Sequence, residues 1–512
     1  MRKYIFFRLV PAKLKQDDPN PPTKYARDHP IFQKIWVLIT EGIWREEDAH
    51  WMPMAKEALD LVFQLGDGPD SLAGDMIKDV CSKIQEEHNR LVGSEMGDEL
   101  KVETFILRRL CFLAGHVALC MLIYLDVNVF TELKRRNWLR EQKKEKDAKK
   151  EKEKEKKKAK RASMVVRQSA MSTPRNQGDV EEDDMGCVGA EADDMEAEFI
   201  RKICERELLS PEHLLGNLAP LVVTICANPT KYPDCDLRAS ASLALAKLML
   251  VSSEFCEKHL QLLFTVLEKA EEPVIRANLI IALGDLSCRF PNTVEPWTPK
   301  MYARLHDDVT SVRSNTLTVL AHLILNDMIK VKGQISDMAF CIVDPIDKIA
   351  GLSKLFFAEL AKKGNTLYNV MPDIVSRLSD SEVGIEEEAF RSVMRYIIGL
   401  IEKDKLQESL IEKLCHRFRS TNTERQWRDI AYCLSLFSYR YSEPKILTDL
   451  SLTHFNSYSD RSLKKLSDNI GCWADKLHSD SVYTSISVIL AGAKKTGVGA
   501  GRFVIDLEIL YN

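Results

Sequence analysis

The chain has 512 residues, 45% of them apolar, and a formal net charge of −4 at pH 7, an ordinary balance for folded proteins. Its 13 cysteines are scattered, without a C-x-x-C pair or a zinc-like spacing of cysteine and histidine. We therefore expect reduced, buried thiols in a nuclear or cytosolic protein, and neither a disulfide nor a bound metal. The cysteines in apolar, helix-like stretches include Cys111, Cys120, Cys341 and Cys433.

Two apolar runs resemble targeting or membrane segments only superficially. The N-terminal MRKYIFFRLV is interrupted by Arg8 and is followed by no small-residue cleavage site, so we expect no signal peptide. The run LCFLAGHVALCMLIYL from Leu110 contains His116 and is shorter than the roughly 20 residues that a spanning helix needs. A buried helix explains it more simply, and we predict no membrane partner.

Helix pairs are predicted from the start of the folded part of the chain. Residues 1–29 are expected to be irregular. After Pro30, the stretches IFQKIWVLITEGIW and PMAKEALDLVFQL form two helices separated by the acidic EEDAH turn, and GDGPD ends the second. Further helices are expected from about Ser71 to Val92 and from Val102 to about Leu125. We therefore predict a HEAT-like helical segment over residues 30–142.

A highly charged, disordered insert is predicted at residues 143–195. It begins with interleaved lysine and glutamate, as in KKEKDAKKEKEKEKKKAKR, and ends strongly acidic, so neither part can bury enough apolar surface to fold. The lysine-rich part is either a solubilising tether or an electrostatic arm that contacts phosphate groups. Ser163 in KRAS and Thr173 in STPR are candidate phosphorylation sites, where added phosphate would change the attraction between the basic and acidic blocks.

The dominant pattern of the chain is a repeat of about 37 residues between Pro211 and Ile401. Three columns of apolar residues recur in step, and the second and third follow the first by about eight and eleven positions, which is the spacing of one helical face. Such columns predict the buried faces of successive helices. The first column is Leu237, Ile275, Val312, Ile349 and Ile385, the second is Leu245, Leu283, Leu320, Phe357 and Val393, and the third is Leu248, Leu286, Leu323, Leu360 and Tyr396.

Charged residues mark the turns between these helices. Acidic residues precede the helices, and Arg238, Arg276 and Arg313 directly follow the first column. Acidic turns at this period are typical of HEAT-type helix pairs, which must stack because one pair cannot bury its apolar face. We predict an all-α fold, a HEAT/armadillo-like α-solenoid of stacked antiparallel helix pairs over residues 196–480, with a weakly defined C-terminal helix and tail over 481–512.

No sequence motif indicates catalysis or a cofactor. GVGAG at Gly497–Gly501 lacks the preceding strand, the third glycine and the following helix of a dinucleotide loop, so we interpret it as a linker. No serine or cysteine lies in a nucleophile elbow or beside a histidine base. A helical repeat array without such motifs is typical of a binding scaffold, so we predict no catalytic residue, no cofactor, no metal ligand and no small-molecule substrate.

The segment KKGNTLYNVMPDI is the most distinctive connection between two predicted helices. We expect Gly364 and Asn365 to end one helix and Pro372 to lie near the start of the next, with Tyr368 and Asn369 in the connection. A tyrosine in such a loop either staples the next helix or anchors an interface, and both interpretations stay open.

The residues RANLIIALGDLSCRFPNTVEPWTPKMYARLHDD, from Arg276 to Asp308, resemble the signature of the condensin complex subunit 1 family, the D-type HEAT-repeat subunits of the chromosome-condensing complex. Similar agreement occurs in LILNDMIKVKGQISDMA, KKGNTLYNVMPDIVSRLSDSEVGIEEEAF and LSDNIGCWADKL, and nearer the N-terminus in HPIFQKIW and EADDMEAEFIRKICERELL. The resemblance covers nearly the whole chain. The N-terminal half of the family and its charged C-terminal tail are expected to be missing.

The resemblance implies a non-catalytic regulatory subunit that binds the kleisin subunit and the ATPase heads of the structural-maintenance-of-chromosomes (SMC) pair. It also implies contacts with double-stranded DNA and chromatin, and a location in the nucleus and on chromosomes with a cytoplasmic pool. The family segment that matches Tyr368 and Asn369 contacts an ATPase head, so these residues are candidates for that interface. Basic surfaces would hold DNA phosphates without sequence specificity. The DNA-contact candidates are Lys300, Arg304, Lys330 and Lys332, beside the lysine arm.

Two other classes of function stay open. Another HEAT scaffold, either the corresponding subunit of the second condensin or a nuclear transport receptor, has the same helix-pair pattern, although a transport receptor is expected to have a longer array, an acidic inner surface and no lysine arm. An enzyme hidden in the insert or the termini is the third hypothesis. Kleisin co-purification tests the first two hypotheses, and nucleotide hydrolysis by the isolated chain would support the third.

Overall fold

The computed structural model describes residues 24–92, 102–136, 138–139, 142, 197–330, 334–380, 382, 384–420 and 423–437. Within this part of the chain the regular structure is helical, and the isolated bridge between Tyr25 and Gly66 is its one β-type pairing. The chain divides into two compact units between Ala282 and Leu283, inside α11 (Pro273–Arg289). The predicted bounds of the insert and of the C-terminal tail lie outside the described residues and stay predictions.

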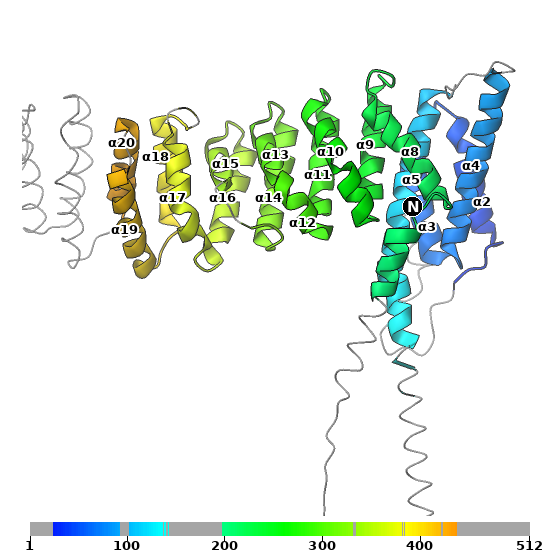
Figure 1. Cartoon of the computed structure of the whole chain (residues 1–512), viewed down its shortest axis with the longest axis horizontal. Coiled ribbons are helices and arrows are strands. Elements are labelled where there is room, and N and C mark those ends of the chain that lie inside the picture. The colour runs from blue at the N-terminus through cyan, green and yellow to red at the C-terminus, as the bar shows by residue number, and fades with distance from the viewer. Residues whose placement is uncertain are drawn as a thin grey trace, which may run out of the picture. The chain divides into compact units, whose positions relative to one another are not determined.

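Unit 1 comprises residues 1–282 and begins with the predicted helix pair (Figure 1). Pro30 and Pro69 each begin a helix, a position where the missing N–H costs no hydrogen bond. Gly68 has a φ of 60°, which suits the glycine-rich turn that separates α3 from α4. The helices are α2 (Pro30–Thr40), η1 (Gly42–Trp44), α3 (Trp51–Leu65), α4 (Pro69–Val92), α5 (Thr104–Ile123), η2 (Tyr124–Val129), η3 (Ile203–Glu207), α8 (Leu214–Ala227), α9 (Cys235–Met249) and α10 (Ser253–Lys269).

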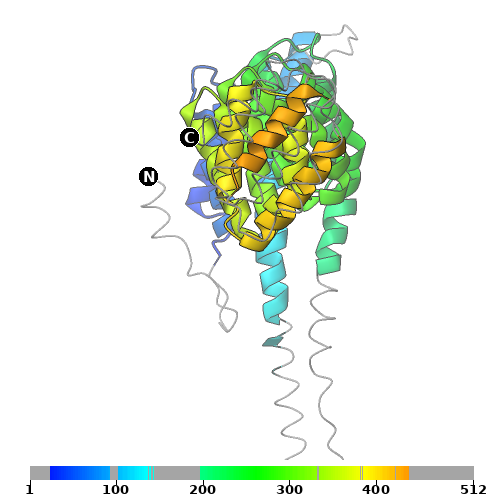
Figure 2. The same cartoon turned by 90° about the vertical axis from the view of Figure 1, so that its left-hand side faces the viewer.

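Helix α5 is the central element of unit 1, packed against α3, α8 and α9. It continues through the π-helical turn η2 to Arg136, and this stretch of 33 residues is long and apolar enough by length and composition to cross a membrane. However, 61% of its most apolar window is buried inside the protein. The apolar run from Leu110 is therefore part of a buried helix, as predicted, although the helix is longer than the run. Figure 2 shows the end of this helix, in cyan, extending beyond α3, α8 and α9 in the same direction as the segment that carries η3.

A buried arginine joins α5 to the turn between η1 and α3. The Arg109 guanidinium donates hydrogen bonds to the carbonyl oxygens of Gly42, Ile43, Arg45 and Asp48 at 3.2, 2.9, 2.8 and 2.8 Å. It also lies 5.1 Å from the centroid of the Trp51 ring, and the Arg109 side chain is only 1% exposed. One side chain from a helix remote in the sequence thus adds a donor to four carbonyl oxygens of an irregular turn, three of which also accept a backbone N–H.

Unit 2 comprises residues 283–512, and its described part is built of stacked helix pairs (Figure 1). In one layer α14 packs on α16 and α18 packs on α20, and in the other layer α15 packs on α17 and α17 packs on α19. Its described helices are α12 (Pro291–Val294), η4 (Glu295–Trp297), α13 (Thr298–Tyr302), η5 (Ala303–His306), α14 (Thr310–Leu325), α15 (Ile335–Phe340), η6 (Cys341–Val343), α16 (Asp347–Lys362), α17 (Thr366–Leu378), α18 (Glu387–Gly399), α19 (Asp404–Ser420) and α20 (Glu424–Ser435).

The three predicted apolar columns form the buried faces of α9, α11, α14, α16 and α18, except that Ile385 lies just before α18. Apart from Ile385 and Tyr396, every member of the columns is at most 2% exposed. Ile385 is half-buried because it precedes the first turn of α18, and Tyr396 is half-buried because its hydroxyl reaches the Lys354 carbonyl at 2.8 Å. The sequence period therefore predicted both the fold class, an all-α solenoid of helix pairs, and its buried faces.

The arginine that follows the first column links successive turns within a unit. Arg313 donates to the Asp344 carboxylate at 2.9 and 3.3 Å and to two carbonyl oxygens of the preceding turn at 2.9 and 3.1 Å. Arg238 likewise forms an ion pair with Glu272 in unit 1. Arg276 donates to the two carbonyl oxygens of its own preceding turn, both at 2.9 Å. These bonds satisfy turn carbonyls that no helix ladder can reach.

Most of the described thiols are buried, as predicted, but Cys235 and Cys288 are exposed. Cys111, Cys120, Cys341 and Cys433 are free and buried, and burial raises the pKa of Cys111 and of Cys341 to about 12. Such thiols stay protonated at neutral pH and are poor nucleophiles.

Candidate interaction surfaces and a buried Asp–His–Cys cluster

Tyr368 and Asn369 lie in the first turn of α17, so the prediction that they lie in a connecting loop is wrong. Gly364, with a φ of 62°, does end the preceding helix, whereas Asn365 is the N-cap residue of α17 and its side chain makes no capping hydrogen bond. Pro372 was expected near the helix start but lies in the helix interior, where it has no N–H to offer the Tyr368 carbonyl four residues earlier. The helix thus begins earlier than the position of this proline suggested.

Tyr368 is held in place by the neighbouring helix α19. Its hydroxyl lies 2.7 Å from the Ser409 hydroxyl, and the Lys413 Nζ atom lies 3.9 Å from the centroid of the Tyr368 ring. Hydrogen bonds from Lys413 and from Ser409 hold the pKa of Tyr368 below its ordinary value. Tyr368 is half-buried and Asn369 is exposed. The pair therefore presents a pre-positioned ring beside an adaptable amide, a combination suited to an interface anchor.

The predicted DNA-contact residues differ in how freely they present their charge. The Lys300 Nζ atom lies 4.9 Å from the centroid of the half-buried Trp297 ring and makes a cation–π contact with it. The Arg304 guanidinium lies 3.6 Å from the Asp307 carboxylate, which partly neutralises its charge, and 23% of the Arg304 side chain is exposed. Lys330 follows α14 and is exposed. The other predicted site residues, Lys332, Ser163 and Thr173, and the lysine arm lie outside the described residues.

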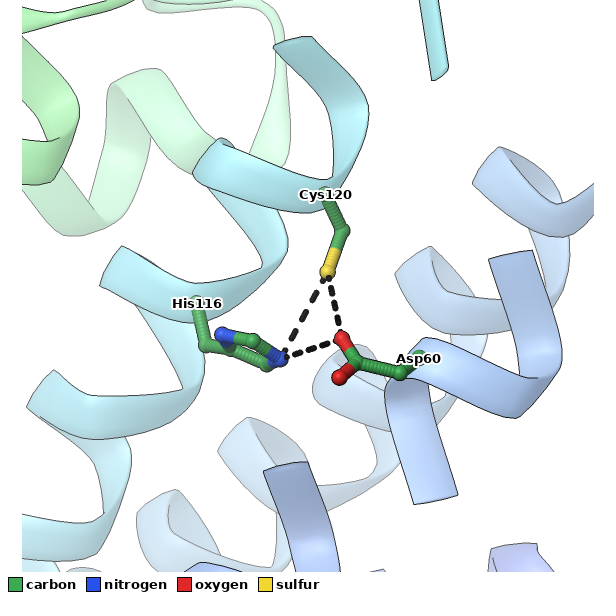
Figure 3. Close-up of side chains that lie close together, drawn as sticks. All are labelled: Asp60, His116 and Cys120. Carbon is green, nitrogen blue, oxygen red and sulfur yellow. Dashed lines mark hydrogen bonds and ion pairs between the residues drawn. The ribbon is translucent and has the colours of Figure 1, made fainter. Parts of the chain in front are cut away.

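A cluster that was not predicted joins α3 to α5 in unit 1 (Figure 3). The His116 Nε2 atom lies 3.0 Å from the Asp60 Oδ1 atom, and the Cys120 Sγ atom lies 3.6 Å from Asp60 Oδ1 and 3.5 Å from His116 Nε2. His116 and Cys120 are four residues apart and so occupy the same face of α5. The three ligand-type atoms therefore converge on one point between the two helices.

The surroundings of this cluster fix its side chains. His116 stacks on Phe112, with ring centroids 5.7 Å apart and planes 10° apart. The Lys56 Nζ atom lies 3.0 Å from the Asp60 Oδ2 atom, so the second oxygen of the carboxylate is held away from the cluster. The His116 and Asp60 side chains are 5% and 21% exposed. The cluster is therefore largely buried and reaches solvent on the Asp60 side.

The electrostatics of the cluster do not favour nucleophilic catalysis. Burial opposes ionisation of Asp60, but hydrogen bonds from His116 and Lys56 outweigh it and hold the pKa of Asp60 well below its usual range. For Cys120, burial and then the Asp60 charge raise the pKa of the thiol to about 12. The thiolate is the reactive form of cysteine, so this site lacks the lowered thiol pKa that an activated nucleophile requires.

Sequence reasoning missed the cluster because Asp60 is 56 residues from His116. The one local indication was the spacing of His116 and Cys120 within an apolar helix, and that spacing alone is as common in cores as in binding sites.

Known proteins similar to this chain are condensin subunits. Residues 274–435 match the model of the family described as non-SMC mitotic condensation complex subunit 1. The chain is 43% identical to condensin complex subunit 1 of Xenopus laevis over 486 residues, which covers 95% of this chain and 32% of that protein. It is 40% identical to the human condensin complex subunit 1 over 491 residues, with the same two shares. The chain thus spans about one third of the length of these relatives.

Among solved structures, the chain resembles one from the S. pombe condensin Cnd3-Cnd2 subcomplex. The TM-score is 0.39 and the sequence identity is 10%, with 87% of this chain and 57% of that chain covered.

Proposed function

Since the chain belongs to the condensin complex subunit 1 family, we propose that it serves as a non-catalytic HEAT-repeat scaffold that binds the kleisin subunit, the SMC ATPase heads and DNA in mitotic chromosome condensation. The observation that carries this proposal is the agreement with condensin subunit 1 along nearly the whole chain. Stacked helix pairs suit the role, because they expose long surfaces on which several partners can bind at once. The proposed location is the nucleus and chromosomes, with a cytoplasmic pool.

Tyr368 and Asn369 are the residues that we propose for the SMC head interface. A half-buried tyrosine fixed by α19 loses little conformational entropy when a partner covers it, which favours affinity. Lys413 beside the ring adds a positive charge to the same surface. The head is therefore expected to meet this surface with an acidic or carbonyl-rich segment.

A pull-down from mitotic cell extract tests the scaffold role and the interface together. The wild-type chain is expected to recover kleisin and SMC subunits, and the Tyr368→Ala, Asn369→Ala double variant is expected to lose the SMC subunits. Tyr396→Ala is the matched control, because Tyr396 is also half-buried and its hydroxyl also forms a hydrogen bond to a neighbouring helix, donating to the Lys354 carbonyl at 2.8 Å. Equal recovery of SMC subunits by all three chains would exclude the proposed interface, and recovery of no condensin subunit by the wild-type chain would contradict the scaffold role.

Phosphate contacts are the proposed basis of DNA binding. Lys330 is the most freely exposed described candidate, whereas Arg304 is partly neutralised by Asp307 and Lys300 is stacked on Trp297. Each phosphate contact that is lost lowers the slope of log affinity against log salt by about 0.9. Lys330→Ala is expected to lower this slope by about that amount, and deletion of the lysine-rich residues 143–161 by more.

Fluorescence anisotropy with duplex DNA at several salt concentrations measures these slopes. Lys78→Ala is the control, since Lys78 lies on α4 of unit 1 with its side chain 66% exposed. An unchanged slope after the deletion would exclude the arm and leave the helical surface. Hydrolysis of nucleotide by the purified chain alone would instead favour the enzyme hypothesis, and capture of transport cargo would favour a nuclear transport receptor.

A further inference from the structure

The buried cluster of Asp60, His116 and Cys120 has the composition and geometry of a metal site (Figure 3). We propose that these three side chains bind one divalent transition metal ion, for which zinc suits an oxygen, nitrogen and sulfur ligand set, and that the ion ties α3 to α5. This proposal is independent of the scaffold function, because it concerns a site inside unit 1.

The distances between the ligand atoms fit a tetrahedral ion. Zinc bonds of about 2.0–2.3 Å place neighbouring ligand atoms about 3.3–3.6 Å apart. The two edges that end on Cys120 Sγ are 3.5 and 3.6 Å, and the edge between Asp60 Oδ1 and His116 Nε2 is 3.0 Å. An ion therefore needs only the Asp60–His116 edge to lengthen by about 0.3 Å.

The surrounding protein already orients two of the ligands. Phe112 holds the His116 ring by stacking, and Lys56 holds the second oxygen of Asp60, so that Oδ1 points into the cluster. Such supporting contacts are typical around metal ligands because they reduce the cost of ordering the site. The partial exposure of the Asp60 side chain, 21%, gives the ion a path from solvent.

Charge and proton balance also permit binding. When the ion binds, the Cys120 thiol releases its proton to solvent and the sulfur becomes a thiolate ligand. His116 gives up the Nε2 proton that it shares with Asp60, carries its one remaining ring proton on Nδ1 after exchange with solvent, and offers the lone pair of Nε2 to the ion. One thiolate and one carboxylate then balance the two charges of the ion, and a water molecule completes the tetrahedron. In the metal-free chain the same thiol donates to Asp60 at 3.6 Å.

Cobalt titration of the full chain tests the proposal. The protein, with the exposed Cys235 and Cys288 changed to serine, is stripped with a chelator, dialysed and titrated with Co²⁺. The expected result is a thiolate-to-cobalt charge-transfer absorption that saturates at one ion per chain and disappears when zinc is added. Zinc is also expected to raise the midpoint of thermal unfolding, because it binds the folded state. Absence of the charge-transfer absorption would overturn the proposal.

Variants locate the site. Cys120→Ser and the nearly isosteric Asp60→Asn are expected to weaken cobalt binding by at least about tenfold. Cys111→Ser is the matched control, since Cys111 is a buried thiol on the same helix α5 outside the cluster, and it should leave binding unchanged. Circular dichroism checks folding, and if Cys120→Ser does not fold, Asp60→Asn carries the test. Retention of wild-type affinity in either folded cluster variant would overturn the proposal.

Discussion

The two units bury their helices by different means. In unit 2, α14, α16 and α18 repeat the same apolar columns, and the packing of α15 on α17 recurs as the packing of α17 on α19. In unit 1, α5 approaches α9 so closely that a Cβ atom on Gly115 would lie 2.7 Å from the Ala244 Cα atom. The same helix buries the polar side chains Arg109 and His116 against groups more than 50 residues away in the sequence. Stability is therefore distributed over many similar contacts in unit 2 and concentrated in a few special residues in unit 1.

The largest expected effect tests the column packing of unit 2. Leu360 is fully buried on α16, whereas Leu355 on the same helix is 59% exposed. Leu360→Ala removes buried apolar surface and leaves a cavity, so we expect a loss of about 3–5 kcal/mol in the free energy of unfolding, and less than about 0.5 kcal/mol for Leu355→Ala. Urea unfolding followed by circular dichroism measures both. Similar losses of unfolding free energy for the two variants would show that burial in the apolar columns does not determine the stability of unit 2.

A somewhat smaller effect tests the concentrated contacts of unit 1. Arg109→Ala removes four charge-assisted hydrogen bonds. The carbonyl oxygens of Gly42, Arg45 and Asp48 still accept a backbone N–H, whereas that of Ile43 loses its donor, and a buried unsatisfied group costs about 1–3 kcal/mol. We expect a net loss of about 3 kcal/mol. Its neighbour Arg108 forms a 2.6 Å ion pair with Asp236, whose side chain is 69% exposed. Arg108→Ala should cost at most about 1 kcal/mol.

Limited proteolysis distinguishes these two arginine variants as well. Loss of the Arg109 bonds should expose the turn between η1 and α3 to cleavage, whereas Arg108→Ala should leave the cleavage pattern of the wild-type chain. Equal stability of the two variants would mean that the turn does not depend on Arg109.

Alanine substitutions at two glycines are expected to change the stability of the protein in opposite directions. Gly115→Ala forces a methyl group against Ala244 of α9, and such overpacking costs about 1–3 kcal/mol. Gly351 lies within α16, and no neighbouring side chain or helix comes within 4 Å of the position that a Cβ atom would occupy there. Gly351→Ala should therefore gain up to about 1 kcal/mol from helix propensity alone. Thermal unfolding is expected to shift down for the first variant and up for the second. A gain in both would show that α5 and α9 can separate without cost.

The difference between the units also explains what could be predicted from the sequence. A repeated contact leaves a periodic pattern, so the spacing of Leu245, Leu283 and Leu320 is enough to locate the helices that carry the apolar columns. A unique contact leaves no pattern, because its partners are remote in the chain. For that reason, the sequence could not predict the hydrogen bonds from Arg109 to the turn carbonyls. It could not predict the contact between Asp60 and His116 either.

The error at Tyr368 has another cause. Proline is most easily accommodated in the first turn of a helix, so Pro372 suggested a later helix start than the structure has. Packing of α17 on α19 outweighs the loss of one backbone hydrogen bond at Pro372, and the local preference is overridden. Tyr368 and Asn369 were thus given the wrong secondary structure, and their role in an interface stays a prediction.

The last expected effect concerns the pH dependence contributed by a buried carboxylate in unit 2. The Asp429 side chain is 1% exposed and lies 3.0 Å from Arg425, yet burial outweighs this pairing and raises the pKa of Asp429 from 3.8 to about 6. The folded state therefore binds this proton more tightly than the unfolded state, so Asp429 makes folding less favourable as pH rises from about 4 to about 6. Above that range the penalty is fully present.

Asp429→Asn should remove this pH dependence, which amounts to about 2–3 kcal/mol between pH 4 and pH 7 in the wild-type chain. Urea midpoints across this range measure it, and the difference between the two proteins cancels other titrating groups. A wild-type chain that gains stability relative to Asp429→Asn as pH rises would show that the Arg425 pairing outweighs burial. The contact between Arg425 and Asp429 would then stabilise unit 2, as the Arg109 contacts are expected to stabilise unit 1.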